Sequence, residues 1–224
     1  MCNVSGMLFF INNANIDEFQ GKRVIEIGSK YVNGTVRPFI EKYLKPKEYI
    51  GVDIEPGRSV DIILPAENIV EYFGKESFDI LISTELMEHV KDWKLIVKNF
   101  KDILIKDGLI YITTRSRGFP FHGHPFDFWR YELEDIREIF SDFEIILLNK
   151  DHSSPGVFFK AKKPKDYTPN NIDHIELYSI LLRKRIKFIP NNLSIKKDQN
   201  FKKIRHFILR IIRYLDKKIN PPKC

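Results

Sequence analysis

Short apolar runs alternate with amphipathic segments along the first 160 residues of the chain. Apolar runs bounded by turn residues are typical of buried strands, and apolar residues three or four positions apart are typical of helices. The strands predicted on this basis are 23–27, 49–53, 60–63, 78–83, 109–114, 144–148 and 156–159. The predicted helices are 35–44, 66–73, 92–104 and 132–140.

Alternation of strands and helices predicts a parallel sheet with both faces covered. The last two strands predict a hairpin at one edge, so we expect an α/β, Rossmann-like, doubly wound sheet of seven strands that is mostly parallel, with its last strand antiparallel. Right-handed crossovers place every loop after a strand on the same side, where such sheets bind ligands. The polar residues that follow strand ends are therefore the candidate site residues.

The chain changes character near residue 160. Residues 160–167 are charged and carry a proline, which is typical of a domain boundary. Residues 160–224 hold 18 Lys and Arg against 5 Asp and Glu, whereas residues 1–159 hold 19 against 25. Helical patterns follow at 172–188 and 201–219. We predict a catalytic or binding domain over 1–160 and a basic helical C-terminal extension over 161–224.

Composition narrows the class of protein. Charged residues make up 30% of the chain and apolar residues 43%, as in globular domains. No apolar run reaches the roughly 18 residues that suggest a membrane span, and residues 1–13 lack the features of a signal peptide. Cys2 and Cys224 stand at opposite ends of the chain, which indicates no disulfide framework and no metal-ligand spacing. We expect a cytoplasmic protein.

Polar residues at the ends of the first two strands indicate a nucleoside site. Gly28 follows the first strand and lets backbone approach a ligand, and Ser29 can donate a hydrogen bond. Glu26 is a carboxylate in an apolar strand and needs a partner, such as the cationic end of an amino-acid ligand. Asp53 ends the second strand, where a carboxylate can accept hydrogen bonds from a ribose diol. The chain has neither the G-x-G-x-x-G of nicotinamide sites nor a P-loop.

These motifs resemble the class I S-adenosylmethionine (SAM)-dependent methyltransferases, particularly the branch similar to ubiquinone-biosynthesis methyltransferases. The resemblance covers about residues 22–160 and rests on four segments. They are the glycine loop VIEIGSKYVNG (24–34), the strand YIGVD (49–53), the block SFDILISTELMEHV (77–90) and the strand LIKDGLIYITT (104–114). The glycine loop departs from the family's usual G-x-G, because Ser29 and Lys30 follow Gly28 and the next glycine is Gly34.

The resemblance implies SAM as the cofactor and a role for each matching residue. Asp53 and Ile54 would hold the ribose and flank the adenine, and Ala66 and Glu67 would lie by the adenine amine. Pro65 stands where the family often has an aspartate. The residues implied at the methionine end or near the methyl group are Glu26, Gly28, Ser29, Ser83, Thr84 and Glu85. Gly34 is a further candidate cofactor-binding residue.

The loop after the fifth predicted strand, residues 115–131, is the candidate acceptor site. It is longer than ordinary connections of this kind, and long loops are often functional. His122, His124 and Asp127 are candidates for removing a proton from an acceptor, with His124 and Asp127 as a base and its orienting partner. The candidate acceptor-binding residues are Arg115, Arg117, Trp129 and Arg130, the arginines by attracting an anionic group.

Structural roles for this loop remain open. The two histidines can cap turns, and Asp127 can cap the next helix. Trp129 can pack in the core, and Arg130 can pair with Asp127. A similar stretch occurs in methyltransferases of the same branch, but it does not name a substrate.

The predicted helix 201–219 has one apolar stripe and an opposite cationic face. Three interpretations stay open: packing of the stripe on the core, peripheral contact with an anionic membrane surface, and nucleic-acid binding, which rests on charge alone.

Taken together, the residues predict a SAM-dependent methyltransferase that methylates an O or N atom of a small-molecule, glycan or lipid-linked acceptor. The alternatives are an RNA methyltransferase anchored by its basic tail and a non-catalytic SAM-binding interaction module.

Overall fold

The computed structural model describes residues 3–123 and 126–190. Residues 1–189 form one compact unit, and a second unit begins at Pro190. His124 and the predicted helix 201–219 lie outside the described residues. Within the described ranges, no helix is long and apolar enough to span a bilayer.

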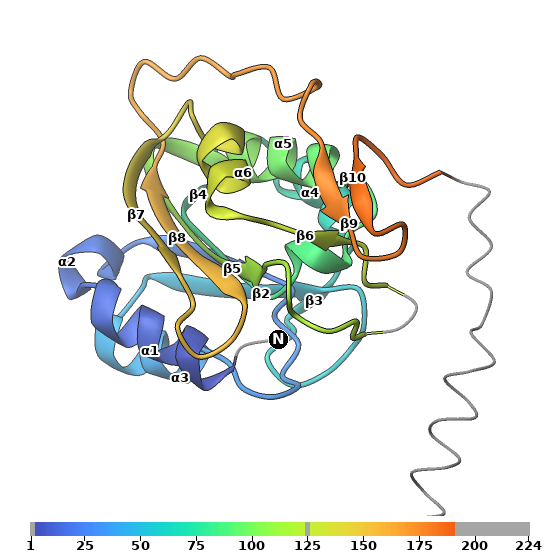
Figure 1. The fold of residues 1–224 in the computed structure, drawn as a ribbon. Coiled ribbons are helices and arrows are strands. Elements are labelled where there is room, and N and C mark those ends of the chain that lie inside the picture. The colour runs from blue at the N-terminus through green and yellow to red at the C-terminus, as the bar shows by residue number, and fades with distance from the viewer. Residues whose placement is uncertain (1–2, 124–125, 191–224) are drawn as a thin grey trace, which may run out of the picture. The chain divides into compact units, whose positions relative to one another are not determined.

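A seven-stranded sheet in the order β3-β2-β1-β4-β5-β8-β7 organises the first unit (Figure 1). Its strands are β1 (Arg23–Ile27), β2 (Glu48–Asp53), β3 (Ile62–Ile63), β4 (Phe78–Thr84), β5 (Leu104–Arg115), β7 (Glu144–Lys150) and β8 (Gly156–Lys162). Strands β3, β2, β1, β4 and β5 pair in parallel, and β8 is antiparallel to both β5 and β7. The predicted fold, a mostly parallel sheet with its last strand antiparallel, is confirmed.

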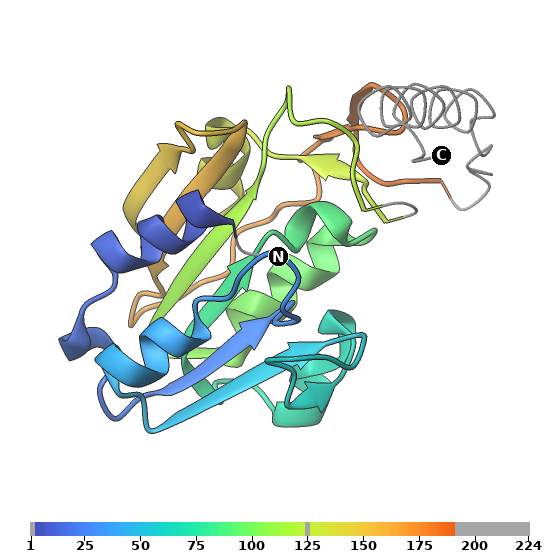
Figure 2. The same ribbon diagram turned by 90° about the horizontal axis from the view of Figure 1, so that it is seen from below.

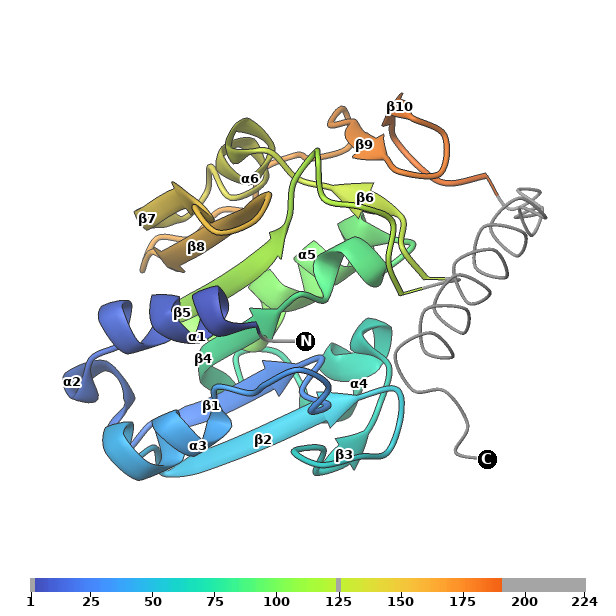
Figure 3. The same cartoon turned by 60° about the horizontal axis from the view of Figure 1, so that its bottom comes forward.

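Helices cover the two faces of this sheet, as Figures 1 and 3 show. One face carries α1 (Val4–Asn13), α2 (Ile16–Phe19), α3 (Arg37–Phe39) and the π-helical turn η1 (Ile40–Leu44). The other face carries the 3₁₀ turn η2 (Ala66–Asn68), α4 (Ile69–Phe73), α5 (Trp93–Ile103) and α6 (Leu133–Ile139). The predicted helix 35–44 is therefore shorter and mostly π-helical.

Burial of apolar and aromatic side chains holds α1 and α2 on the sheet. Phe10 and Phe19 are fully buried with Val24 and Tyr111 in one apolar cluster. The rings of Phe10 and Tyr111 stack with centroids 5.3 Å apart. Removal of this much apolar surface from water is the main stabilising contribution to such a layer.

Helix α5 follows directly from its sequence pattern. The Asp92 carboxylate accepts the backbone N–H of Leu95 at 3.2 Å and so caps the helix. Ile96, Val97 and Phe100 recur at helical spacing and are all buried. The helix thus packs one apolar face against the sheet, and its cap at Asp92 holds the start of the helix in place.

Strand β5 starts earlier than the pattern predicts. The pattern predicts a strand over 109–114, but the strand runs from Leu104 to Arg115. The pairing of β5 with β4 shifts register between Phe78 and Ile80. Asp107 has φ 62° at this point.

The predicted helix over 172–188 is wrong. Two short strands, β9 (Leu177–Ser179) and β10 (Lys184–Ile186), form a hairpin there. Strand β9 pairs with β6 (Trp129–Arg130) in a second, three-stranded sheet (Figures 1 and 2). Ile175, Leu177 and Ser179 are buried at alternate positions, which is the period of a strand. Residues 161–189 thus belong to the compact unit that holds the main sheet.

Candidate active site

A pocket of about 490 Å³ lies at the carboxyl ends of β1, β2 and β4. Gly28 follows β1, Asp53 ends β2 and Glu85 follows β4, so the parallel strands bring these three residues to one edge. The volume lies in the range of pockets for small ligands. The predicted cofactor-binding residues that line the pocket are Gly28, Asp53, Ile54, Ala66, Glu67 and Glu85.

The loop after β1 is folded against β2. The backbone N–H groups of Gly28 and Ser29 both donate to the carbonyl of Val52, at 2.9 and 3.1 Å. Gly28 has φ +82°, and a Cβ there would lie 3.1 Å from the Cβ of Leu86. Conformation and space both favour glycine at this position, and the bare backbone forms part of the pocket wall.

Asp53 fixes the opposite wall. Its Oδ2 accepts the backbone N–H of Lys30 at 3.0 Å, and its Oδ1 accepts that of Glu55 at 3.1 Å. Each carboxylate oxygen can accept a further hydrogen bond. The carboxylate is therefore held in place and retains acceptor capacity for a diol. Lys30 and Glu55 also form an ion pair at the pocket rim.

The Ala66–Glu67 segment is held by a residue that sequence reasoning missed. The buried side-chain amide of Asn99, on α5, donates to the carbonyls of Ala66 and Glu67 at 3.1 and 2.7 Å. An asparagine at a buried position of a helix gives no signal of which loop it contacts. The contact leaves Ala66 and Glu67 as a fixed wall of the pocket.

Glu26 lies within the sheet and has a protein partner. The hydroxyl of Tyr49 donates to its Oε2 at 2.8 Å. Burial raises the pKa of Glu26 to about 7, although the hydrogen bond from Tyr49 opposes that shift. Glu26 does not appear among the pocket-lining residues of the described chain, so its contact with the amino-acid end of a ligand stays a prediction.

Four further predicted cofactor residues are not among the residues that line the pocket in the described ranges. They are Ser29, Gly34, Ser83 and Thr84. The hydroxyls of Ser29 and Ser83 have no hydrogen-bond partner within the part of the chain that the structure describes. Their assigned roles stay predictions.

Glu85 and Arg115 form a buried ion pair that joins the ends of β4 and β5. Burial and the neighbouring Glu88 raise the pKa of Glu85, and Arg115 opposes this shift. Arg115 also lies 3.6 Å from Asp151 and stacks over the ring of Phe119. The guanidinium charge of Arg115 thus interacts with carboxylates inside the protein. Its position in the loop had predicted contact with an anionic acceptor instead.

The other predicted acceptor-binding residues also have structural contacts. Trp129 is fully buried and its ring N–H donates to the carbonyl of Val90 at 3.0 Å. Arg117 stacks over Tyr178, 4.7 Å from the ring centroid. Arg130 is fully buried and pairs with Asp127. None of them lines the pocket as far as residues 3–123 and 126–190 define it.

Asp127 contacts His122, one of the predicted bases, whereas the predicted pair of His124 and Asp127 involves a residue outside the described ranges. Nδ1 of His122 lies 3.1 Å from Oδ2 of Asp127, and the His122 backbone N–H donates to the same oxygen at 2.7 Å. Arg130 donates to both carboxylate oxygens of Asp127, at 2.6 and 2.8 Å. Burial opposes ionisation, but these hydrogen bonds lower the pKa of Asp127 to about 2. Asp127 is therefore an anion that orients His122.

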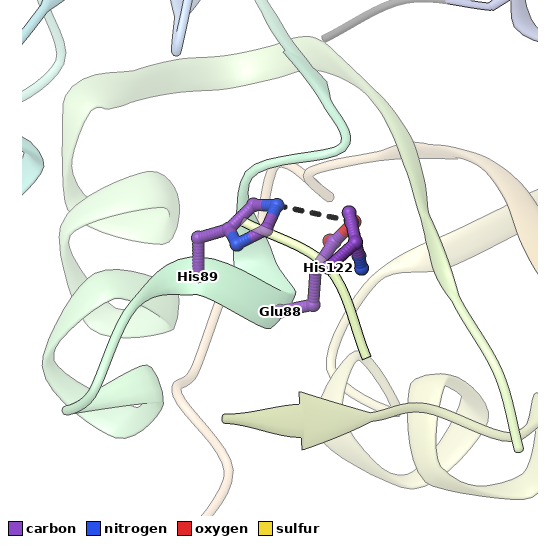
Figure 4. A group of neighbouring side chains, drawn as sticks. All are labelled: Glu88, His89 and His122. Carbon is purple, nitrogen blue, oxygen red and sulfur yellow. Dashed lines mark ion pairs between the residues drawn. The ribbon is translucent and has the colours of Figure 1, made fainter. Parts of the chain in front are cut away.

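Glu88 and His89 join His122 in a cluster next to the pocket (Figure 4). They lie in the 3₁₀ turn η3 (Met87–His89), directly after β4. Glu88 is fully buried and its Oε2 accepts the hydroxyl of Thr114 at 2.8 Å. His89 lines the pocket with Leu86 and Phe128. The segment Glu88–Val90 belongs to the block that carried the family resemblance, but its spacing alone did not show that His122 lies opposite.

Comparison with known proteins agrees with this fold. The family model described as "Methyltransferase domain" matches residues 10–152, more than half of the chain. The chain therefore belongs to this family of methyltransferase domains, whose methyl donor is S-adenosylmethionine.

Individual relatives are distant. The chain is 24% identical to (S)-coclaurine N-methyltransferase of Thalictrum flavum subsp. glaucum over 109 residues, which are 48% of this chain and only 30% of that protein. Its fold is similar to 1,6-didemethyltoxoflavin-N1-methyltransferase of Burkholderia thailandensis, solved with that compound and S-adenosylhomocysteine (TM-score 0.54, 11% identity, 72% and 77% of the two chains). It is also similar to a SAM-dependent methyltransferase of Mesorhizobium loti (TM-score 0.54, 12% identity, 71% and 97%).

Proposed function

We propose that this protein transfers the methyl group of SAM to an O or N atom of a small-molecule acceptor. One observation carries the proposal: a single pocket joins the Gly28–Asp53 edge of the sheet to the loops that hold His89 and Phe128. The first region offers exposed backbone and a fixed carboxylate, which suit an adenosyl group. The second region offers aromatic side chains, which suit the body of an organic acceptor.

SAM supplies an electrophilic methyl group on a sulfonium, and the acceptor lone pair displaces the neutral thioether. The protein contributes mainly by positioning the two partners in line. Gly28 and Asp53 hold the donor end, and the fixed Ala66–Glu67 segment flanks it. A hydroxyl or ammonium acceptor also gives up a proton, and His122, oriented by Asp127, is the residue that we assign to accept it.

The acceptor end of the pocket is largely apolar. Leu86, Val90, Phe126 and Phe128 line it beside His89. Apolar walls with a few polar groups are typical of sites for small organic ligands. By their names, two of the similar proteins are N-methyltransferases of (S)-coclaurine and of 1,6-didemethyltoxoflavin, which supports a small-molecule acceptor here.

The test uses the full chain, radiolabelled SAM and a panel of hydroxy- and amino-bearing small molecules. We expect release of S-adenosylhomocysteine together with labelled product for at least one acceptor, and loss of both in Asp53→Ala. Tight SAM binding without transfer to small molecules, RNA or lipid-linked glycans would instead identify a non-catalytic SAM-binding module.

A further inference from the structure

Three lone-pair-bearing atoms converge at the acceptor end of the pocket. Nε2 of His89 lies 4.0 Å and Nε2 of His122 lies 3.9 Å from Oε1 of Glu88. The ligand atoms offered by the three residues all lie within 4.8 Å of one another (Figure 4). The Glu88 side chain is 0% exposed, and those of His89 and His122 are 16% and 23% exposed.

The second nitrogen of each imidazole fixes the protonation of the first. Nδ1 of His89 contacts the carbonyl oxygen of Phe126, which only accepts, so Nδ1 carries the hydrogen. Nδ1 of His122 contacts the ionised Asp127 carboxylate and carries its hydrogen for the same reason. In the neutral rings both Nε2 atoms therefore present lone pairs toward Oε1 of Glu88.

A buried carboxylate oxygen and a buried imidazole nitrogen that both lack a donor are costly, and a cation placed between them would remove that cost. Oε1 of Glu88 and Nε2 of His89 indeed lack hydrogen-bond partners among the residues that the structure describes. Separations of 3.9 and 4.0 Å are too long for a shared proton. Two ligand atoms of a tetrahedral Zn²⁺, each bonded at about 2.0–2.2 Å, lie about 3.4 Å apart. The side chains of His89 and His122 would therefore move slightly toward Glu88 on binding such an ion.

We propose that Glu88, His89 and His122 bind a divalent transition-metal ion such as Zn²⁺. Two imidazoles and one carboxylate are ligands that such ions prefer over Mg²⁺ or Ca²⁺. Asp127 completes the site as the carboxylate that orients a ligating histidine. Glu85 is not a ligand in this assignment, because its carboxylate is paired with Arg115.

Three protein ligands leave at least one coordination position for water or an acceptor atom. His89 lines the pocket, so that position is beside the acceptor end. This step rests on the proposed function: a hydroxyl acceptor bound to the metal would lose its proton more readily. His122 would then act as a ligand instead of as the base, and the proton of the metal-bound hydroxyl would pass to bulk water. Oxygen acceptors are thereby favoured over nitrogen acceptors.

Titration calorimetry of the chelator-stripped, tag-free full chain with Zn²⁺ alone tests the site. We expect one Zn²⁺ per chain, and an affinity at least tenfold weaker in His122→Ala and in Glu88→Gln. His174→Ala is the matched control, since His174 is exposed and pairs with Glu138 on the surface, and it should bind Zn²⁺ like the unaltered protein. Co²⁺ should give a visible absorption band that His122→Ala lacks.

Thermal unfolding of each variant in the presence of chelator verifies that it is folded. His122 is partly exposed on a loop, so its truncation leaves the core intact. Zn²⁺ binding that is absent, or equally strong in the folded His122→Ala variant, overturns the metal site. SAM affinity, measured separately, distinguishes that outcome from failure of the proposed function: SAM binding without Zn²⁺ binding removes only the metal.

Discussion

The Asp53 carboxylate accepts the backbone N–H of Lys30 at 3.0 Å and thereby ties the end of β2 to the loop after β1. The same loop is held from the other side by the Val52 carbonyl, which accepts the N–H groups of Gly28 and Ser29. The shape of the donor end of the pocket thus depends on contacts between two neighbouring parallel strands, and on a glycine where the chain turns between them.

Replacement of Gly28 by alanine should impair both stability and SAM binding. A left-handed conformation costs a residue with a Cβ about 1–2 kcal/mol, and the added carbon would crowd Leu86. Gly21→Ala is a matched control, because Gly21 also has positive φ but a Cβ added there would meet no atom within 4 Å. We expect Gly21→Ala to lose stability alone and Gly28→Ala to lose SAM affinity as well, by calorimetry. Equal SAM affinity of the two variants would contradict the role of the Gly28 backbone.

Replacement of only one partner of the buried Asp127–Arg130 ion pair should lower the free energy of unfolding. Asp127→Asn leaves the guanidinium of Arg130 buried without its counter-charge, which costs about 3 kcal/mol or more of unfolding free energy. The double variant Asp127→Asn, Arg130→Met should recover part of that loss, since the unpaired charge is gone. Denaturant unfolding measures both variants. Glu138→Gln breaks the exposed pair with His174 and should change stability by less than about 1 kcal/mol. A double variant no more stable than the single one would argue against this account.

Glu26 predicts a pH dependence of stability with a defined sign. Its pKa is raised from 4.5 to about 7 in the folded protein. Between these values the folded state binds more protons than the unfolded state, so the contribution of Glu26 to stability falls as pH rises. The full loss in unfolding free energy amounts to about 3 kcal/mol.

Glu26→Gln does not titrate, so its stability relative to the unaltered protein should increase from about pH 5 to about pH 8 by an amount of that order. Unfolding curves at several pH values provide the measurement. Glu71→Gln, on the exposed side of α4, should show no such trend, and a flat difference for Glu26→Gln would mean that Tyr49 fully compensates the burial.

Much of the fold follows from the sequence because its determinants are local. A few neighbouring residues are enough to predict three of its features: the apolar strand 23–27, the capped amphipathic helix 92–104 and the glycine after β1. The topology rules for parallel sheets then bring Gly28 and Asp53 together without further information. The helix predicted over 172–188 is wrong because the structure of this segment depends on a distant contact. Its apolar spacing fits a helix, but pairing of β9 with the distant β6 makes it a strand.

The details of the site depended on contacts that periodicity does not encode. Asn99 reaches Ala66 across 33 residues, and His89 contacts Phe126 across 37. The residue pattern predicts that Asp127 orients His124, and it does not show the contact of Asp127 with His122. Arg115 and Arg130 were assigned to an acceptor from their residue type and position, whereas buried carboxylates pair with both.

Calorimetric titration of SAM into the full-length protein and into Asp53→Ala tests the central claim most directly. The claim is that the carboxylate at the end of β2 helps to hold an adenosyl group at this edge of the sheet. We predict SAM binding to the unaltered protein and more than tenfold weaker binding to Asp53→Ala, with Glu71→Gln unaffected. Equal affinity in Asp53→Ala, or no binding to the unaltered protein, would contradict it.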